Sequence, residues 1–172
     1  MTSHAYDVVE RYRDRGGNLM FLSANNFFWR VRREGHALVK EALWRDLGRP
    51  EAALVGVQYV GSDGGIRQAP YTVSGAAAAP WAFAGIGFGD GSIFGSYGIE
   101  IDARSPESPP DTLVLAQALG AVSPTRVGEI TYYETPAGAK VFAAGTLNFA
   151  ASIEEPPVAR LLENLWAKLA AP

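Results

Sequence analysis

Apolar residues near the start of the chain recur with the spacing of one helical face. From Ala5 to Tyr12 they fall three or four positions apart, which predicts a helix over His4 to Arg15. Ser3 is a suitable N-cap for this helix, and Gly16 is a suitable end.

The next segment, Asn18 to Ser23, holds an uninterrupted apolar run, Leu19 to Leu22. Such a run is typical of a strand covered on both faces, as in a parallel sheet. Only one predicted helix and fewer than twenty residues precede it. We therefore expect its partner strand to come from elsewhere.

Two more elements are predicted in this part of the chain. Phe27 to Arg33 alternates between apolar and basic positions, which favours a half-buried strand with one basic face. His36 to Leu47 carries apolar residues at helical spacing, and Gly48 ahead of Pro50 is a strong stop signal. A second helix is therefore predicted over His36 to Leu47.

The rest of the chain favours strands joined by turns. Leu54 to Val60 has strand character, Ser62 to Gly65 reads as a turn, and the stretch 75–98 predicts loops packed by their own aromatic residues. Thr135 to Gly138 predicts a hairpin turn, so the second half is expected to be mostly antiparallel. The further predicted elements are strands over Tyr97–Asp102, Thr112–Ala116, Glu129–Glu134 and Lys140–Thr146, and a final helix that starts at Pro156 and Pro157.

Composition narrows the class of protein. The 172 residues are 48% hydrophobic, which suits one α/β domain over residues 1–172. A net charge of −3 argues against a nucleic-acid partner. The chain has no cysteine, no apolar run long enough to span a membrane and no secretory leader, so we expect a cytoplasmic protein.

Familiar catalytic signatures are missing from the sequence. It holds no Gly-x-Ser-x-Gly elbow, no cysteine nucleophile, no His-Glu-x-x-His helix and no phosphate loop. Gly85 to Gly89 resembles a dinucleotide fingerprint only superficially, because no clear strand precedes it and no helix follows it.

Ser23 to Asn26 follow the carboxyl end of the apolar strand, where open α/β sheets bind ligands. Asn25 and Asn26 are therefore candidate substrate-binding residues, together with Trp29. The alternative is structural, since asparagine also serves tight turns and an aromatic on an apolar strand face is usually core. Arg30, Arg32 and Arg33 are most simply a solvated face or an interface.

Glu100 and Asp102 stand two positions apart in a predicted strand, so both carboxylates are expected on one face. Two such oxygens suit a hard or borderline metal ion. The alternative is a pair that is exposed or bound in ordinary salt bridges. His4 and His36 are too few for a histidine-rich metal cluster.

Several of these segments together resemble one family. The run from Gly16 to Val31 is similar to the "GGN, apolar strand, S-x-N, aromatic, W-R-V" segment of the N,N-dimethylformamidase large (beta) subunit family. The similarity continues in the same order nearly to the end of the chain, through Gly98–Asp102, Tyr132–Thr135, Val141–Phe149 and Asn164–Trp166.

The resemblance implies a glutamine-amidotransferase-like three-layer α/β fold with a largely antiparallel β-rich second half. It implies an enzyme that hydrolyses small N-substituted amides with a metal, thought to be iron, held by tyrosine and carboxylates. Glu100 matches one ligand, with Asp102 supporting it. The family's upstream His-x-Glu-Tyr-type motif has no counterpart here, so we expect an N-terminally truncated chain that is incomplete as a catalyst alone.

Three alternatives stay open. A non-catalytic binding or scaffold domain of the same fold would leave Glu100 and Asp102 in solvent or in salt bridges. Half of a split enzyme would leave an open edge on the strand Leu19 to Leu22 and form oligomers, or bind a missing region or subunit. A carbohydrate-binding role for the aromatic stretch Trp81 to Tyr97 is the third.

Overall fold

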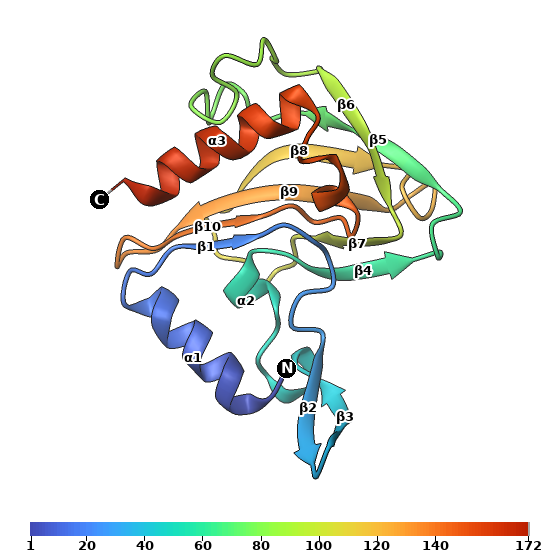
Figure 1. Ribbon diagram of the computed structural model, residues 1–172, viewed down its shortest axis with the longest axis vertical. Coiled ribbons are helices and arrows are strands. Elements are labelled where there is room, and N and C mark those ends of the chain that lie inside the picture. Colours follow the sequence, from blue (N-terminus) through green and yellow to red (C-terminus); the bar gives the residue numbers. More distant parts are fainter. Residues whose placement is uncertain (172) are drawn as a thin grey trace.

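The computed structural model describes residues 1–171 and is built around one curled, mostly antiparallel sheet (Figure 1). The sheet has six strands in the order β1-β10-β9-β8-β5-β6. Their bounds are β1 (Leu19–Phe21), β5 (Gln68–Val73), β6 (Ile93–Gly98), β8 (Leu113–Leu119), β9 (Val127–Glu134) and β10 (Lys140–Ala143).

The β1 end of this sheet has three layers. β1 pairs in parallel with β10, and the helices α1 (Ser3–Asp14) and α3 (Pro156–Ala170) lie on opposite sides of the pair (Figure 1). Leu19 and Phe21 pack toward the α1 and α2 side, whereas Met20 and Leu22 pack against the main core that contains α3. The predicted strand with two covered faces is confirmed. The expectation that its partner strand comes from elsewhere is wrong on one side, where β10 of the same chain pairs with it.

Both long helices are confirmed, with two corrections at α1. Its predicted apolar face is not the buried one, because Val8 and Tyr12 are 47% and 54% exposed whereas Tyr6 is buried. The side chain of Thr2, not Ser3, caps α1 by accepting from the backbone N–H of Ala5. Proline occupies the first turn of α3, where a missing N–H costs nothing. The apolar stripe of α3 is buried at Val158, Leu161, Leu165 and Leu169.

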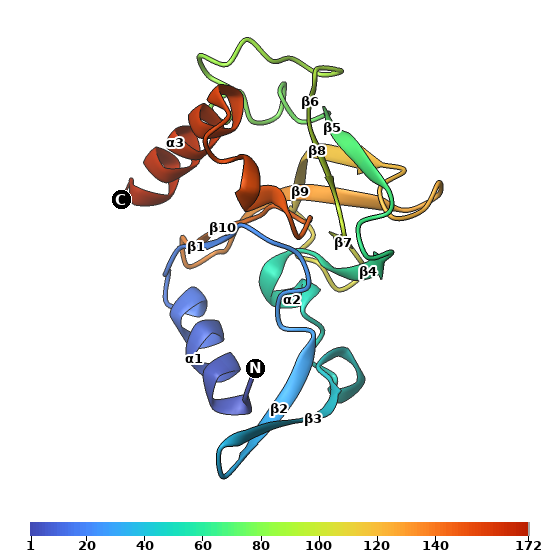
Figure 2. The same ribbon diagram turned by 45° about the vertical axis from the view of Figure 1, so that its right-hand side comes forward.

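The helix predicted over His36 to Leu47 is wrong. This segment forms β3 (Ala37–Leu43), which pairs with β2 (Trp29–Glu34) in a hairpin that projects from the rest of the molecule (Figure 2). A short 3-10 turn, η1 (Arg45–Leu47), follows it. Gly35 has a φ of 60° in the two-residue loop, and such a glycine favours a tight hairpin turn over a helix.

A second small sheet pairs β4 (Gln58–Ser62) with β7 (Glu100–Ala103). The strand predicted over Leu54–Val60 is therefore only partly right, because a short helix, α2 (Ala52–Val55), takes its first residues. The strand predicted over Tyr97–Asp102 is interrupted at Ile99, whose φ of 67° turns the chain from β6 into β7.

The glycine-rich stretch 75–98 is mostly turns, as predicted, and ends in β6. Its aromatic residues pack into the protein: Trp81 meets the ring of Tyr132 at 4.9 Å between centroids, and Phe88 stacks on Phe94 at 5.5 Å. These contacts account for the aromatic residues without a carbohydrate ligand. β5 was not predicted.

The remaining strands agree with their predictions. β9 and β10 form the expected hairpin across Thr135 to Gly138, and β8 pairs with β9. A 3-10 turn, η2 (Phe149–Ser152), leads to α3. In the main core Tyr97 stacks on Phe149 of this turn and packs against Tyr71. No helix among the described residues is long and apolar enough to cross a bilayer.

Candidate functional site

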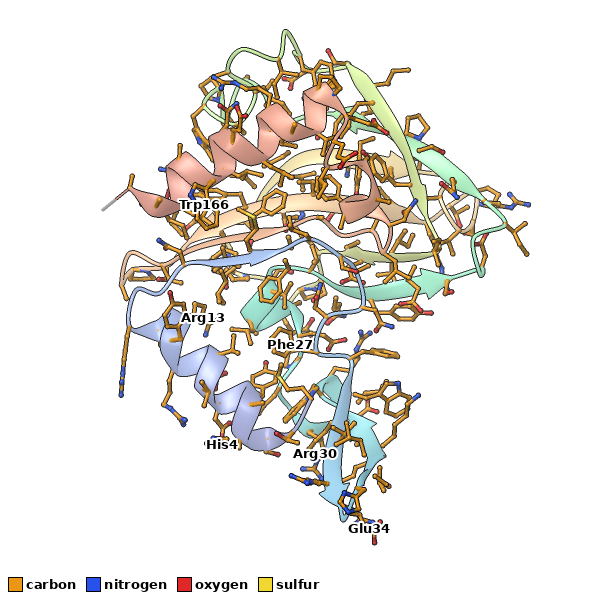
Figure 3. All side chains as sticks on the ribbon, viewed as in Figure 1. His4, Arg13, Phe27, Arg30, Glu34 and Trp166 are labelled. Atoms are coloured by element: carbon orange, nitrogen blue, oxygen red, sulfur yellow. The ribbon has the colours of Figure 1, made fainter. Side chains whose placement is uncertain are left out.

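The predicted ligand-binding turn follows β1 directly. We call residues 23–27 the Asn25 turn. Asn25 and Phe27 both have left-handed backbone angles, with φ values of 60° and 57°. The side chain of Asn26 donates to the backbone oxygen of Ser23 at 2.8 Å, which closes the turn. Phe27 packs between Tyr6 and Phe21, so it joins the turn to α1 and β1 (Figure 3).

Asp102 holds this turn from inside the protein. The backbone N–H of Asn25 donates to both carboxylate oxygens of Asp102, at 2.9 Å to each. The backbone of Asp102 is fixed in turn, because its N–H donates to the oxygen of Gly145 at 2.9 Å. Asp102 is only 1% exposed. Its carboxylate therefore acts as a buried anchor for the left-handed conformation at Asn25.

Glu100 lies at the outer end of the same arrangement. The side-chain amide of Asn25 donates to Oε2 of Glu100 at 2.6 Å, and Glu100 is half-buried. The amide oxygen of Asn25 is buried and has no hydrogen-bond partner. Asn25 thus joins the two candidate carboxylates, through its backbone to Asp102 and through its side chain to Glu100.

The electrostatics of the pair are unusual, since no cation compensates it. Neither Glu100 nor Asp102 takes part in a salt bridge within residues 1–171. The pKa of Asp102 is raised from 3.8 to about 7, chiefly by burial and also by the charges of Glu51 and Glu100, while the backbone N–H groups of Asn25 and Asn26 act in the opposite direction. The alternative, in which both carboxylates are exposed or bound in ordinary salt bridges, is therefore wrong for Asp102.

Trp29 does not join this arrangement. It lies on β2, where its ring meets the edge of Phe28 at 5.5 Å and lies under the ammonium of Lys40 at 5.1 Å. Asn26 serves the turn through its bond to Ser23, in agreement with the structural alternative.

The basic face of β2 is neutralised within the hairpin. Arg30 and Arg32 form ion pairs with Glu41, at 2.9 and 3.4 Å, and Arg32 also reaches Glu34 at 3.3 Å. These arginines therefore belong to the hairpin's own surface.

Sequence reasoning missed two contributors to the site. Glu51 is fully buried, in an ion pair with Arg45, and its charge acts on Asp102. Leu147 donates its N–H to the backbone oxygen of Glu100 at 3.0 Å and accepts from the hydroxyl of Ser23 at 3.2 Å. The only signal for Leu147 was its place just after β10, beside the end of β1.

The described residues do not supply a complete set of metal ligands. They contain no group of three or more histidine, cysteine, aspartate or glutamate side chains able to hold a metal ion. Glu100 fits as one oxygen ligand by its exposure and donor chemistry. Asp102 does not, because both of its oxygens accept from Asn25.

Comparison with known proteins agrees with the ordered motifs. No curated protein sequence matches the chain. A family profile described as N,N-dimethylformamidase beta subunit-like, C-terminal, matches residues 1–160. The matched range covers α1, the Asn25 turn, both small sheets and all of the six-stranded sheet. The chain therefore belongs to the N,N-dimethylformamidase beta subunit-like, C-terminal family.

Proposed function

We propose that this chain is the C-terminal domain of a metal-dependent amide hydrolase that acts on small N-substituted amides, and that it is incomplete as a catalyst alone. The observation that carries the proposal is the link from Asp102 through Asn25 to Glu100, in a chain of the dimethylformamidase-like family. Glu100 is the proposed ligand, and Asp102 positions it by fixing Asn25.

The charge balance supports a ligand with positive character. Two carboxylates held by one asparagine without a neighbouring cation favour an electropositive group beside Glu100. Iron is the metal that the family resemblance implies. A bound metal ion would polarise the carbonyl of an amide substrate. The other ligands would come from residues outside the described set.

The layer arrangement supports the finer fold proposal, a glutamine-amidotransferase-like sandwich. Support comes from the β1 end of the sheet, where the parallel pair β1 and β10 has helices on both faces. The antiparallel strands from β5 to β9 make up the β-rich second half.

A non-catalytic binding or scaffold domain is the second candidate. The absence of a three-donor group among residues 1–171 favours it. The burial of Asp102 without an ion pair goes against it, because the hydrogen bonds from Asn25 offset only part of the cost of burying a carboxylate.

The test compares this chain with a version extended upstream in its own genome. Iron content is measured by elemental analysis, and hydrolysis is measured on a panel of small N-alkyl amides. We expect the extended form to bind iron and turn over, and Glu100→Gln to lower its iron content at least about tenfold.

Glu107→Gln is the matched control, since Glu107 is an exposed carboxylate on a loop. This variant should keep full iron content. Stoichiometric iron in the Glu100→Gln protein would overturn the ligand assignment. An extended form that neither binds metal nor hydrolyses amides would favour the scaffold function.

A further inference from the structure

The β2–β3 hairpin has two faces that differ in charge. One face holds the ion pairs of Arg30 and Arg32 with Glu41, which neutralise it. The other consists of residues that pair across the two strands or alternate along them, and we call it the Trp29 face: Trp29, Val31, Arg33, Leu38 and Lys40. Its two cations form no salt bridge within residues 1–171, so the Trp29 face carries uncompensated positive charge.

The Trp29 face also presents apolar side chains to solvent. Leu38 is 69% exposed, and Trp29 and Val31 are half-buried. Figure 2 shows the hairpin extending away from the large sheet and its helices. A two-stranded hairpin exposed on both faces is marginally stable at best. A surface that covered the Trp29 face would therefore stabilise the hairpin and bury Leu38 at the same time.

A hollow of complementary character lies elsewhere on the molecule. It measures about 340 Å³ and lies between the end of α1, the loop before β8 and the turn that joins β9 to β10. Three prolines and three carboxylates line it, and we call it the proline hollow: Pro109, Pro110, Pro136, Asp14, Asp111 and Glu134. It offers apolar walls and acidic groups together.

One of these carboxylates has no cation of its own. Asp14 binds Arg13 at 2.7 Å, and Glu134 binds Lys168 at 3.0 Å. Asp111 is exposed and forms no salt bridge within the described part of the chain. Asp111 is therefore available to a cation from another molecule.

We propose that the Trp29 face of one copy of this chain docks in the proline hollow of a second copy. Leu38 would enter the hollow between the proline rings, and Arg33 would pair with Asp111. Proline loses no side-chain entropy on burial, so three prolines suit such a contact. Because the contact joins two different surfaces, it gives a closed dimer when each hairpin enters the hollow of the other copy, and longer assemblies when it does not.

The distribution of charge over the chain favours a second copy as the occupant. The hairpin carries four lysine and arginine side chains and two carboxylates, whereas the whole chain has a net charge of −3. The rest of the molecule is therefore acidic, so the hairpin of one copy is attracted to the body of another. Contact between two hairpins is disfavoured, because Arg33 and Lys40 of one would meet the same cations of the other.

Self-association tests the proposal and needs neither metal nor amide substrate, so its outcome is independent of the amidase test. The 172-residue chain is studied by sedimentation equilibrium from about 1 μM to about 1 mM, in low salt and in about 0.5 M NaCl. We expect the average mass to rise above that of the monomer with concentration. High salt should weaken the association several-fold, because it screens exposed charges.

Two exposed apolar residues provide a matched pair of variants. Leu38→Asp should weaken association at least about tenfold, because it places a carboxylate at the centre of the contact and next to Asp111. Ile66→Asp is the control, since Ile66 is 86% exposed on the turn between β4 and β5, and it should leave association unchanged. Urea unfolding checks that both variants fold.

A charge exchange tests the pairing of Arg33 with Asp111. Arg33→Glu and Asp111→Lys should each weaken association at least about threefold, and the double variant should recover it, because opposite charges meet again across the contact. Glu107→Lys alters the same loop by the same charge outside the hollow, so it should not weaken association.

Three results would overturn the proposal. The first is a chain that stays monomeric at about 1 mM. The second is self-association that Leu38→Asp leaves unchanged, which would assign the contact to another surface. The third is a double variant of Arg33 and Asp111 that associates no better than the single variants.

Discussion

Asn25 donates its side-chain amide to Glu100 at 2.6 Å while its backbone N–H donates to Asp102 at 2.9 Å, so one asparagine sets the relative position of two carboxylates. The hydrogen bonds join the end of β1 to β7, which lie in different sheets.

Two replacements of Asn25 separate the contribution of its left-handed backbone angle to stability from that of its hydrogen bond to Glu100. Asn25→Ala should destabilise the fold by about 2 kcal/mol, because alanine loses the amide and also resists a φ of 60°. Asn25→Gly removes the amide but accepts that angle, so it should cost about 1 kcal/mol less. Urea unfolding measures both. A glycine variant as stable as the wild type would mean that the bond to Glu100 adds nothing to stability.

The carboxyl of Asp102 should make stability depend on pH. Its pKa in the folded protein is about 7, above the ordinary 3.8, so the folded state holds the proton more tightly than the unfolded state. This group's contribution is therefore fully present below about pH 4 and is lost as pH rises to about 7, by up to about 4 kcal/mol.

Asp102→Asn removes the titrating carboxyl, so the difference in stability between the two proteins reports Asp102 and not the other acidic residues. Unfolding of both proteins is measured at several pH values, and the stability of the wild type relative to the variant should fall between about pH 4 and about pH 7. A difference that is the same at every pH would contradict the raised pKa.

Gly145 should tolerate no side chain. A Cβ at this position would lie 2.1 Å from the backbone oxygen of Glu129, and its φ is 67°. Gly145→Ala should therefore cost about 3 kcal/mol or more. Gly138→Ala is the control, because Gly138 has a φ of 86° with nothing within 4 Å of its Cβ, and it should cost about 1 kcal/mol. If thermal unfolding gave the same loss of stability for both variants, close packing at Gly145 would not be the cause.

Neighbouring residues of α3 should respond differently to truncation. Leu165 is 0% exposed, so Leu165→Ala should cost about 2–5 kcal/mol through lost burial and a cavity. Trp166 is 71% exposed, and Trp166→Ala should change the unfolding free energy by less than about 0.5 kcal/mol. A large loss of unfolding free energy in Trp166→Ala would mean that the ring of Trp166 contributes to the stability of the fold.

The sequence indicated β8, β9, β10 and α3 because each combines a clear period with turn or proline signals at its ends. It misled at β3, where the half-buried residues are Val39, Ala42 and Leu43, a helix-like spacing. The hairpin projects from the protein and has a bulge between Arg30 and Val31, so burial does not alternate along it.

The residue types of the candidate site could be predicted from the sequence, but the hydrogen bonds among them could not. Spacing alone placed Glu100 and Asp102 on one strand, and the end of an apolar run singled out Asn25. The left-handed angle at Ile99 that starts β7 was not foreseeable, because a β-branched residue rarely adopts it. Nor does any local pattern report that Asn25 meets residues 75 and 77 positions away.

The pairing of β1 with β10 has a consequence for the order in which the protein assembles. Leu19 aligns with Val141, so this contact closes one of the longest loops in the chain. Contacts of such separation form late in folding and open early under native conditions, and a short terminal strand opens most readily. The Asn25 turn follows β1 without a break, so it is released together with that strand. Glu100 would then lose the hydrogen bond from Asn25 while β8 and β9 remain paired, so the link between the two carboxylates would open before the fold does.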